Sequence, residues 1–343
     1  MSNNRMAVVS KGVIGKMFIP AMVPGNVICS NGDILVSCHN SCDLSEDEGV
    51  YYYRSKDAGK TWELGEYSFK SMYKRGGIEA STTITCLKDG TLVMPFVDGY
   101  FIKKGEINRH INMCTAVSED NGYTWKNVDI LVSSMIETFP YGKIIEFEDY
   151  LMLTVCGSCN NFGIGNWQVQ TLYSESKTEI SWENYYTITK NQGDETSTVL
   201  LPDGSLVSVI RGYKDNFMDR DKNHRKHPFY ISFSTTEGKF WTKPKNMGIR
   251  GTTPCLHVTP KGNLLFGYRK VNPDKSSVCF ISISKDGGKT WKDCIELELP
   301  EGDFQWYNGG YPTFSNMSEG NIFVTFHNGY PEWSAFYNIL KEE

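Results

Sequence analysis

An octapeptide recurs along this chain of 343 residues, and it constrains the fold more than any other feature. Three copies are nearly identical and two are looser. They begin at Ser55 (SKDAGKTW), Ser118 (SEDNGYTW), Ser284 (SKDGGKTW), Ser234 (STTEGKFW) and Ser174. The tryptophans that close the copies, at positions 62, 125, 182, 241 and 291, lie 63, 57, 59 and 50 residues apart. Self-similarity at a fixed period of this length indicates a repeat architecture.

A second signal, a glycine turn followed by an apolar strand, alternates with the octapeptide. Its glycines, at positions 32, 90, 204, 262 and 320, are separated by 58, 114, 58 and 58 residues, and the long step is two repeats with Asp149-Tyr150 at its middle. Each unit reads as apolar strand, turn, apolar strand, variable loop, alternating strand and Asp-containing turn. The sequence therefore predicts an all-β fold, a six-bladed β-propeller of four-stranded antiparallel blades. Residues 1–343 form a single domain in this prediction, and the segment from Val8 to Val13 completes the last blade.

Composition and charge exclude several classes of function. The 35 basic and 40 acidic side chains give a net charge of −5, which does not suit a nucleic-acid-binding protein that needs a basic face. No apolar run approaches the ~20 residues of a membrane span, and none near the N-terminus has the length of a signal peptide. We therefore expect no nucleic-acid or membrane partner and a cytoplasmic location, with a secreted mature form left open.

Among the ten cysteines, Cys156 and Cys159 have C-x-x-C spacing, but no second pair or histidine lies at a spacing that would complete a zinc site. Without a signal peptide the cysteines are expected to be reduced structural thiols. No phosphate loop, metal cluster or other cofactor signature is present, so we predict no cofactor. The sequence carries no indication of the oligomeric state.

A ligand pocket of a propeller lies on its central axis, where the inner strands of the blades begin. The repeat places six residues at those starts. They are Phe18, Glu79, Glu137, Glu195, Thr252 and Tyr311. Three glutamates and a tyrosine on one ring are unusual for a channel without function, because buried carboxylates are costly unless they are paired. Trp167, in a rim loop, is a further candidate for stacking on a sugar.

The repeated octapeptide resembles the Asp box of the sialidase (neuraminidase) superfamily, whose members are six-bladed propellers. The resemblance implies an exo-acting, retaining glycoside hydrolase that removes a terminal acidic sugar from a glycan. The box itself is a turn: its Asp accepts backbone N–H bonds, its Gly adopts a conformation closed to other residues and its Trp packs between sheets. It therefore identifies the fold and says little about activity.

Two segments resemble the catalytic strands of that superfamily. The run from Asp194 to Arg211 resembles the stretch that holds a catalytic Glu and an active-site Arg, which implies that Glu195 is a catalytic base. GGYPTF, with Tyr311, resembles the segment of the nucleophilic tyrosine. A free phenol has a pKa near ~10, so it attacks poorly at neutral pH unless a carboxylate takes its proton. Sialidases use this pair in place of two carboxylates.

The resemblance also implies a general acid and an arginine clamp. The acid belongs to the loop CDLSEDEGV, where the family motif selects Asp47, with Asp43 in reserve. Arg211 and Arg269 correspond to two of three arginines that bind a substrate carboxylate. The first arginine is missing, because MFIP has Phe18 where the family motif has Arg. The missing arginine should weaken the binding of a sialic acid by about 2–5 kcal/mol, the usual cost of removing one partner of a buried charge pair.

Three functions therefore remain open. The first is a sialidase-type hydrolase for sialic acid or a related acidic sugar. The second is a propeller glycosidase for another sugar, for instance exo-arabinanase-like or specific for a uronic acid or deoxysugar. It would use paired carboxylates, Glu195 with Glu137 or Glu79. The third is a glycan-binding propeller without catalysis, against which the joint presence of Glu195, Arg211 and Tyr311 argues.

Overall fold

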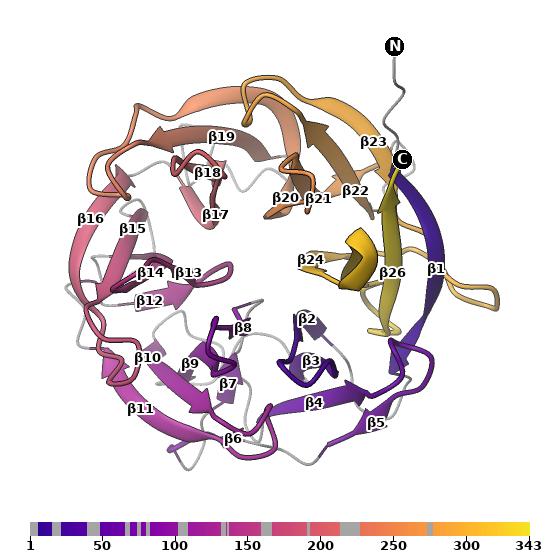
Figure 1. Ribbon diagram of the computed structural model, residues 1–343, viewed down its shortest axis with the longest axis horizontal. Helices are drawn as coiled ribbons and strands as arrows, with labels where there is room; N and C mark the ends of the chain where they lie inside the picture. The colour runs from indigo at the N-terminus through magenta and orange to yellow at the C-terminus, as the bar shows by residue number, and fades with distance from the viewer. Residues whose placement is uncertain are drawn as a thin grey trace.

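The chain forms sheets that surround a central axis. The computed structural model describes residues 6–15, 22–39, 49–65, 69–73, 77–79, 83–101, 109–131, 135, 137–158, 167–190, 193–212, 227–272 and 277–343. Within this part of the chain, strands are the only regular elements apart from one 3-10 turn, η1 (Ser318–Gly320). Figure 1 shows the sheets in radial order, with β2, β8, β17, β20 and β24 near the axis and β1, β5, β11, β16 and β23 outside. No helix among these residues is long and apolar enough to cross a membrane.

Three sheets follow one another along the first half of the chain. The first sheet holds β2 (Met22–Ile28), β3 (Ile34–His39), β4 (Gly49–Ser55), β5 (Glu63–Leu64) and β6 (Phe69–Lys70). The second sheet holds β7 (Gly77–Glu79), β8 (Thr85–Cys86), β9 (Leu92–Phe101), β10 (Arg109–Ser118) and β11 (Lys126–Leu131). The third sheet holds β12 (Glu137–Pro140), β13 (Ile145–Glu146), β14 (Leu151–Ser158), β15 (Trp167–Ser174) and β16 (Glu183–Lys190). All pairings within them are antiparallel.

The second half forms a seven-stranded sheet and a closing sheet. The seven-stranded sheet holds β17 (Gly193–Leu200), β18 (Leu206–Gly212), β19 (His227–Ser234), β20 (Lys245–Val258), β21 (Leu264–Val271), β22 (Ser277–Ser284) and β23 (Lys292–Glu296). Strand β20 pairs with β19 through its first half and with β21 through its second half. The expected propeller-like, all-β arrangement is confirmed. The prediction of six separate four-stranded blades is confirmed only in part, because the described strands pair into five sheets.

The N-terminal strand closes the ring, as the repeat predicts. The closing sheet holds β24 (Gly310–Asn316), β25 (Asn321–His327), β26 (Ala335–Glu342) and β1 (Met6–Gly15). Strand β1 is antiparallel to β26, with Val8 opposite Leu340 and Val13 opposite Phe336. The N-terminal strand and the last strand of the chain therefore share a sheet, which ties the two ends of the ring together.

The three well-conserved octapeptides form the same turn at the end of β4, β10 and β22. In the last of them the Ser284 hydroxyl accepts the amide N–H of Gly288 at 2.8 Å, and the Asp286 carboxylate accepts both the N–H and the hydroxyl of Thr290, at 2.8 and 2.6 Å. The distances in the other two turns are the same. Gly288 has a φ of +92°, which a side chain would strain. These bonds hold the pKa of Asp286 low, at about 2.

The octapeptide tryptophans join the turns to the sheets. The indole N–H groups of Trp62, Trp241 and Trp291 donate to the glycine carbonyl of their own turn at 3.1, 2.7 and 3.1 Å. Trp182 donates instead across to the Thr115 hydroxyl of the second sheet at 2.8 Å, and Trp125 stacks on Tyr52 of the first sheet. Apolar clusters fill the spaces between neighbouring sheets. The tryptophans and glycines of the repeat thus serve packing and turns.

Seven cysteines of the described residues are free of disulfides, and five of these are buried. Burial raises the pKa of the Cys29 and Cys114 thiols to about 12. They act as core residues, as expected.

Candidate active site

The inner strands are irregular where they begin, and this irregularity builds the site. Register shifts interrupt the pairing of four inner strands, β2, β17, β20 and β24. In each strand the shift lies next to the first residues at the central axis. Three residues at these points have a positive φ, namely Val23 (+47°), Thr253 (+55°) and Tyr311 (+54°). Bulges and left-handed β-branched or bulky residues cost free energy and concentrate at functional sites, where they re-aim side chains.

The structure joins two of the residues that the sequence predicts to be catalytic. The Tyr311 hydroxyl donates a hydrogen bond of 2.9 Å to Oε1 of Glu195. The Thr253 amide donates to Oε2 of the same carboxylate at 2.9 Å, and the Tyr311 amide donates to the Thr253 hydroxyl at 3.2 Å. The three residues are 58 positions apart in sequence, so equivalent positions of successive repeats meet at the axis. Both Tyr311 and Glu195 keep partial exposure to solvent.

Arg211 lies against the two carboxylates that begin β17. Its guanidinium donates to both oxygens of Asp194, through Nε at 2.6 Å and through Nη2, and its Nη1 lies 2.8 Å from Oε2 of Glu195. Neighbouring residues of a regular strand point to opposite faces. The register shift between Gly193 and Thr196 removes that alternation and lets both carboxylates reach one arginine.

The electrostatic environment makes Glu195 a better proton acceptor. Burial raises the pKa of its carboxyl, and the neighbouring Asp194 raises it further, while Arg211 and the hydrogen bonds from Tyr311 and Thr253 act in the opposite direction. A base is more effective when its pKa approaches the working pH. The arrangement therefore suits removal of a proton from the Tyr311 hydroxyl.

Arg269, on β21, lies beside the tyrosine from the other side. Its Nε donates to the Gly309 carbonyl at 2.5 Å, and its guanidinium carbon is 5.8 Å from the centre of the Tyr311 ring. A Cβ atom on Gly310 would lie 2.5 Å from Arg269 Nη2. The absence of a side chain at position 310 therefore lets the guanidinium lie against the strand that carries Tyr311.

The other predicted site residues have different outcomes. Glu137 begins β12 and is buried, and Trp167 stacks on Phe139 with ring centres 5.8 Å apart. Glu79 ends β7, where it pairs with Val97; its side chain lies outside the described part of the structure. Three further predicted residues, Phe18, Asp43 and Asp47, also lie outside the described residues. Among the residues that are described, no group of three His, Cys, Asp or Glu side chains is placed to hold a metal ion.

Two residues beside Tyr311 and Glu195 were not among the site residues predicted from the sequence. The buried phenol of Tyr141 lies within electrostatic range of Glu195, Tyr311 and Arg211, and burial raises its pKa well above the usual value. His327 stacks on Tyr311 with ring centres 5.8 Å apart, and burial keeps the pKa of its ring well below the usual value. Nothing in the repeat marks Tyr141, whereas the pairing of His327 with Gly310 follows from the predicted hairpin.

No protein-family model and no curated protein sequence matches the chain. Solved structures do match it over nearly its whole length. A protein of unknown function from Dyadobacter fermentans is 18% identical with a TM-score of 0.77, covering 98% of this chain and 99% of that one. An alpha-L-arabinanase from Penicillium chrysogenum is 16% identical with a TM-score of 0.68, covering 97% and 98%. The sialidase of Trypanosoma rangeli is 12% identical with a TM-score of 0.68, covering 95% of this chain and 55% of that one. The TM-scores establish a shared fold.

Proposed function

We propose that the protein is a retaining exo-glycoside hydrolase that removes a terminal sugar from a glycan, with Tyr311 as nucleophile and Glu195 as its base. The observation that carries the proposal is the 2.9 Å hydrogen bond from the Tyr311 hydroxyl to the Glu195 carboxylate at the axis of the ring. Similarity in fold to an arabinanase and a sialidase supports a glycosidase in general. We also propose that 1–343 is one catalytic domain in which the seven-stranded sheet represents two blades sharing β20.

The proposed mechanism has two displacement steps. Tyr311 attacks the anomeric carbon while Glu195 takes the phenol proton, the bond to the leaving oxygen breaks, and an acid protonates that oxygen. A water then attacks the glycosyl-tyrosine, the acid residue now takes the water's proton, and Glu195 returns its proton to the departing phenolate. We assign the acid to Asp47, with Asp43 in reserve, in the segment that follows β3.

The class of sugar that the enzyme accepts depends on what Arg211 and Arg269 bind. For an acidic sugar, Arg269 would hold the carboxylate at the edge of Tyr311, and Arg211 would share its guanidinium between the substrate and its present partners. A neutral nucleophile also avoids repulsion of an anionic sugar. Phe18, in place of the first arginine of the clamp, argues for an acidic sugar whose carboxylate lies differently from that of sialic acid.

A second candidate is a glycosidase for a neutral sugar, such as a terminal arabinose. The observation that favours it is the engagement of Arg211 with Asp194 and Glu195, which already balances its charge. Such an enzyme would pair Glu195 with a second carboxylate, Glu137 or Glu79. Glu137 begins the inner strand of the neighbouring sheet, as a partner of Glu195 would.

Release of product from a panel of sialyl, uronyl and arabinosyl aryl glycosides tests the proposal. We expect turnover on at least one, with retained configuration at the anomeric carbon by NMR. Tyr311→Phe and Glu195→Gln should each lower kcat by about 10²–10⁴-fold. Full turnover by either variant contradicts the Tyr–Glu mechanism. Loss of turnover in Glu137→Gln but not in Tyr311→Phe supports the paired-carboxylate alternative, and binding without any turnover indicates a glycan-binding propeller.

A further inference from the structure

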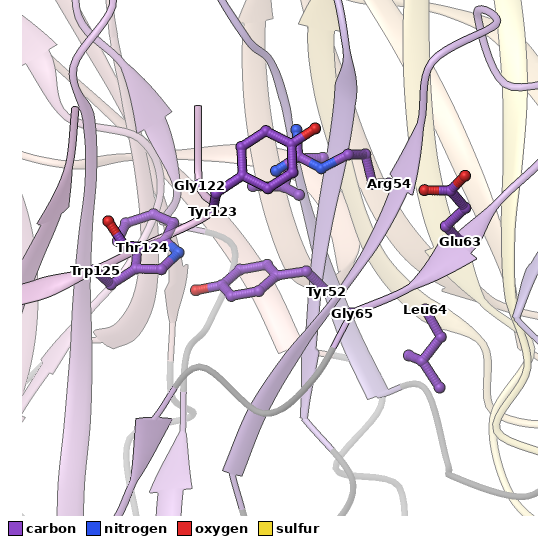
Figure 2. A pocket seen from close by; sticks show the side chains of 10 residues that line it. Tyr52, Arg54, Glu63, Leu64, Gly65, Gly122, Tyr123, Thr124 and Trp125 are labelled. Atoms are coloured by element: carbon purple, nitrogen blue, oxygen red, sulfur yellow. The ribbon is translucent and has the colours of Figure 1, made fainter. Parts of the chain in front are cut away.

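A cleft opens at the outside of the ring, between the first and second sheets and away from the axial site. It has a volume of about 420 Å³. Figure 2 shows its lining, which comes from β3, β4, β5 and the octapeptide turn that follows β10. The lining residues are Leu35, Tyr52, Arg54, Glu63, Leu64, Gly65, Gly122, Tyr123, Thr124 and Trp125.

Two of these residues, Arg54 and Tyr123, depart from the repeat. The sixth octapeptide position is lysine in the copies that begin at Ser55, Ser234 and Ser284, but it is Tyr123 in this one. The residue before the octapeptide is apolar or aromatic in the other four copies, whereas it is Arg54 ahead of Ser55. The hydrogen bonds of the turn do not involve the Tyr123 side chain, whereas Arg54 donates to the carbonyl of Asn121 in this turn. The turn therefore accounts for Arg54 but not for the aromatic ring at position 123.

Arg54 and Tyr123 form a rigid platform. The Arg54 guanidinium binds Asp33 at 2.8 Å through Nη1 and donates to the Asn121 carbonyl at 2.6 Å through Nη2. Its central carbon lies 4.0 Å from the centre of the Tyr123 ring, a cation–π contact. The Arg54 guanidinium thus covers one face of the Tyr123 ring, yet Tyr123 is 60% exposed to solvent. Tyr123 therefore offers a solvent-exposed ring that the Arg54 guanidinium holds from one side.

The rest of the cleft is aromatic and apolar with a polar rim. Tyr52 stacks on Trp125 with ring centres 5.5 Å apart and planes 8° apart, and Leu64 is half exposed beside them. Glu63 stands at the rim, 3.1 Å from Lys56. This combination of aromatic walls with a few polar groups is typical of small-ligand sites.

The charges around the cleft are matched in pairs. Arg54 is bound to Asp33, and Lys56 to Glu63. The charged residues that line the cleft are one cation, Arg54, and one anion, Glu63, so the lining has no net charge to attract an ionic ligand. A ligand that fits must present apolar faces to the rings and hydroxyl groups to the rim, and a neutral sugar does both.

We propose that this cleft is a second saccharide-binding site, which holds a neutral stretch of a glycan chain through stacking on Tyr123 and hydrogen bonds to Glu63 and Lys56. The site is separate from the catalytic pair and does not require catalysis. Its role would be to retain the polymer whose end enters the axial site, and only this last clause rests on the proposed function.

Isothermal titration of the full chain with maltohexaose, cellohexaose and α-1,5-arabinohexaose tests the site. Any oligomer that the enzyme cleaves is titrated in the Tyr311→Phe background. Tyr123→Lys restores the residue of the other repeats, so the turn should fold normally. We expect at least one oligomer to bind and Tyr123→Lys to weaken that binding tenfold or more. The matched control is Tyr185→Lys, which changes a similarly exposed tyrosine on β16 and should have no effect.

The proposal is overturned if none of the three oligomers binds, or if Tyr123→Lys binds as tightly as the native chain. Binding of an aromatic peptide but of no oligosaccharide overturns it as well. Turnover of a small aryl glycoside should be unchanged in Tyr123→Lys. If the chain hydrolyses no glycoside but binds an oligomer in a Tyr123-dependent way, the second site stands and the proposed function fails.

Discussion

Replacing Arg211 by glutamine tests how the axial site is held together. Its guanidinium faces two carboxylates, Asp194 and Glu195, and the side chains are only 21%, 7% and 12% exposed. Removing one member of a buried charge group leaves the other charges unpaired, at a cost of about 3–5 kcal/mol. We therefore expect Arg211→Gln to lower the free energy of unfolding at pH 7 by that amount.

The loss should depend on pH in a definite direction. Arg211 lowers the pKa of Glu195, while burial and Asp194 raise it. In Arg211→Gln the folded-state pKa therefore lies further above its unfolded value, and the folded chain binds more protons between the two. Stability then falls as pH rises through that interval. The loss of unfolding free energy in Arg211→Gln should be largest near neutral pH. It should be smallest in acid, where the Glu195 carboxyl is protonated in both the folded and the unfolded chain.

Urea unfolding from pH 4 to pH 8 measures the deficit, with Arg250→Gln on the exposed part of β20 as the matched control. That control should stay within about 0.5 kcal/mol of the native chain. In the same variant, the acid limb of kcat/KM should move to higher pH because the base accepts its proton more readily. A deficit that does not vary with pH, together with an unmoved acid limb, would refute the reasoning.

Three further predictions concern single contacts. Gly310→Ala places a Cβ atom 2.5 Å from Arg269 Nη2, so KM for an acidic glycoside should rise several-fold with little change in kcat; steady-state kinetics that show an unchanged KM would remove Arg269 from substrate binding. Burial lowers the pKa of Lys143 to about 8, beside the Ser315 hydroxyl at 2.7 Å. The unfolded chain therefore binds the extra proton between pH 8 and about 10.5, and stability should rise across that range by up to about 3 kcal/mol more than in Lys143→Met; parallel curves in urea unfolding would contradict this. Ser284→Ala removes a buried hydroxyl that bonds to the Asp286 carboxylate and accepts the Gly288 N–H, and it should cost about 1–3 kcal/mol of unfolding free energy; an unchanged urea midpoint would show that the turn does not depend on these bonds.

The repeat allowed much of the fold to be predicted. Each octapeptide closes its own hydrogen bonds within seven residues, so its sequence carries its structure without help from distant contacts. The same period brought Glu195 and Tyr311 together, because equivalent positions of a ring of repeats face one axis. The number of separate sheets was not predictable in this way. Strand β20 continues without a break from one pairing partner to the next, and no residue marks that continuity.

The details of the site depended on backbone irregularities that leave no clear mark in the sequence. Strand alternation would place Asp194 and Glu195 on opposite faces, yet the bulge turns both toward Arg211. The positive φ of Tyr311 was likewise not predictable from the sequence, because bulky residues rarely adopt a left-handed conformation. Tyr141 reaches the site by packing alone.

Trapping of the covalent intermediate tests the central claim most directly. Once the glycoside panel has identified the sugar, the enzyme is incubated with a fluorinated, activated glycosyl fluoride of that sugar, digested and analysed by mass spectrometry. The account predicts a glycosyl adduct on the peptide that contains Tyr311, absent from Tyr311→Phe. An adduct on Glu137 or Glu195, with Tyr311 unmodified, would contradict it.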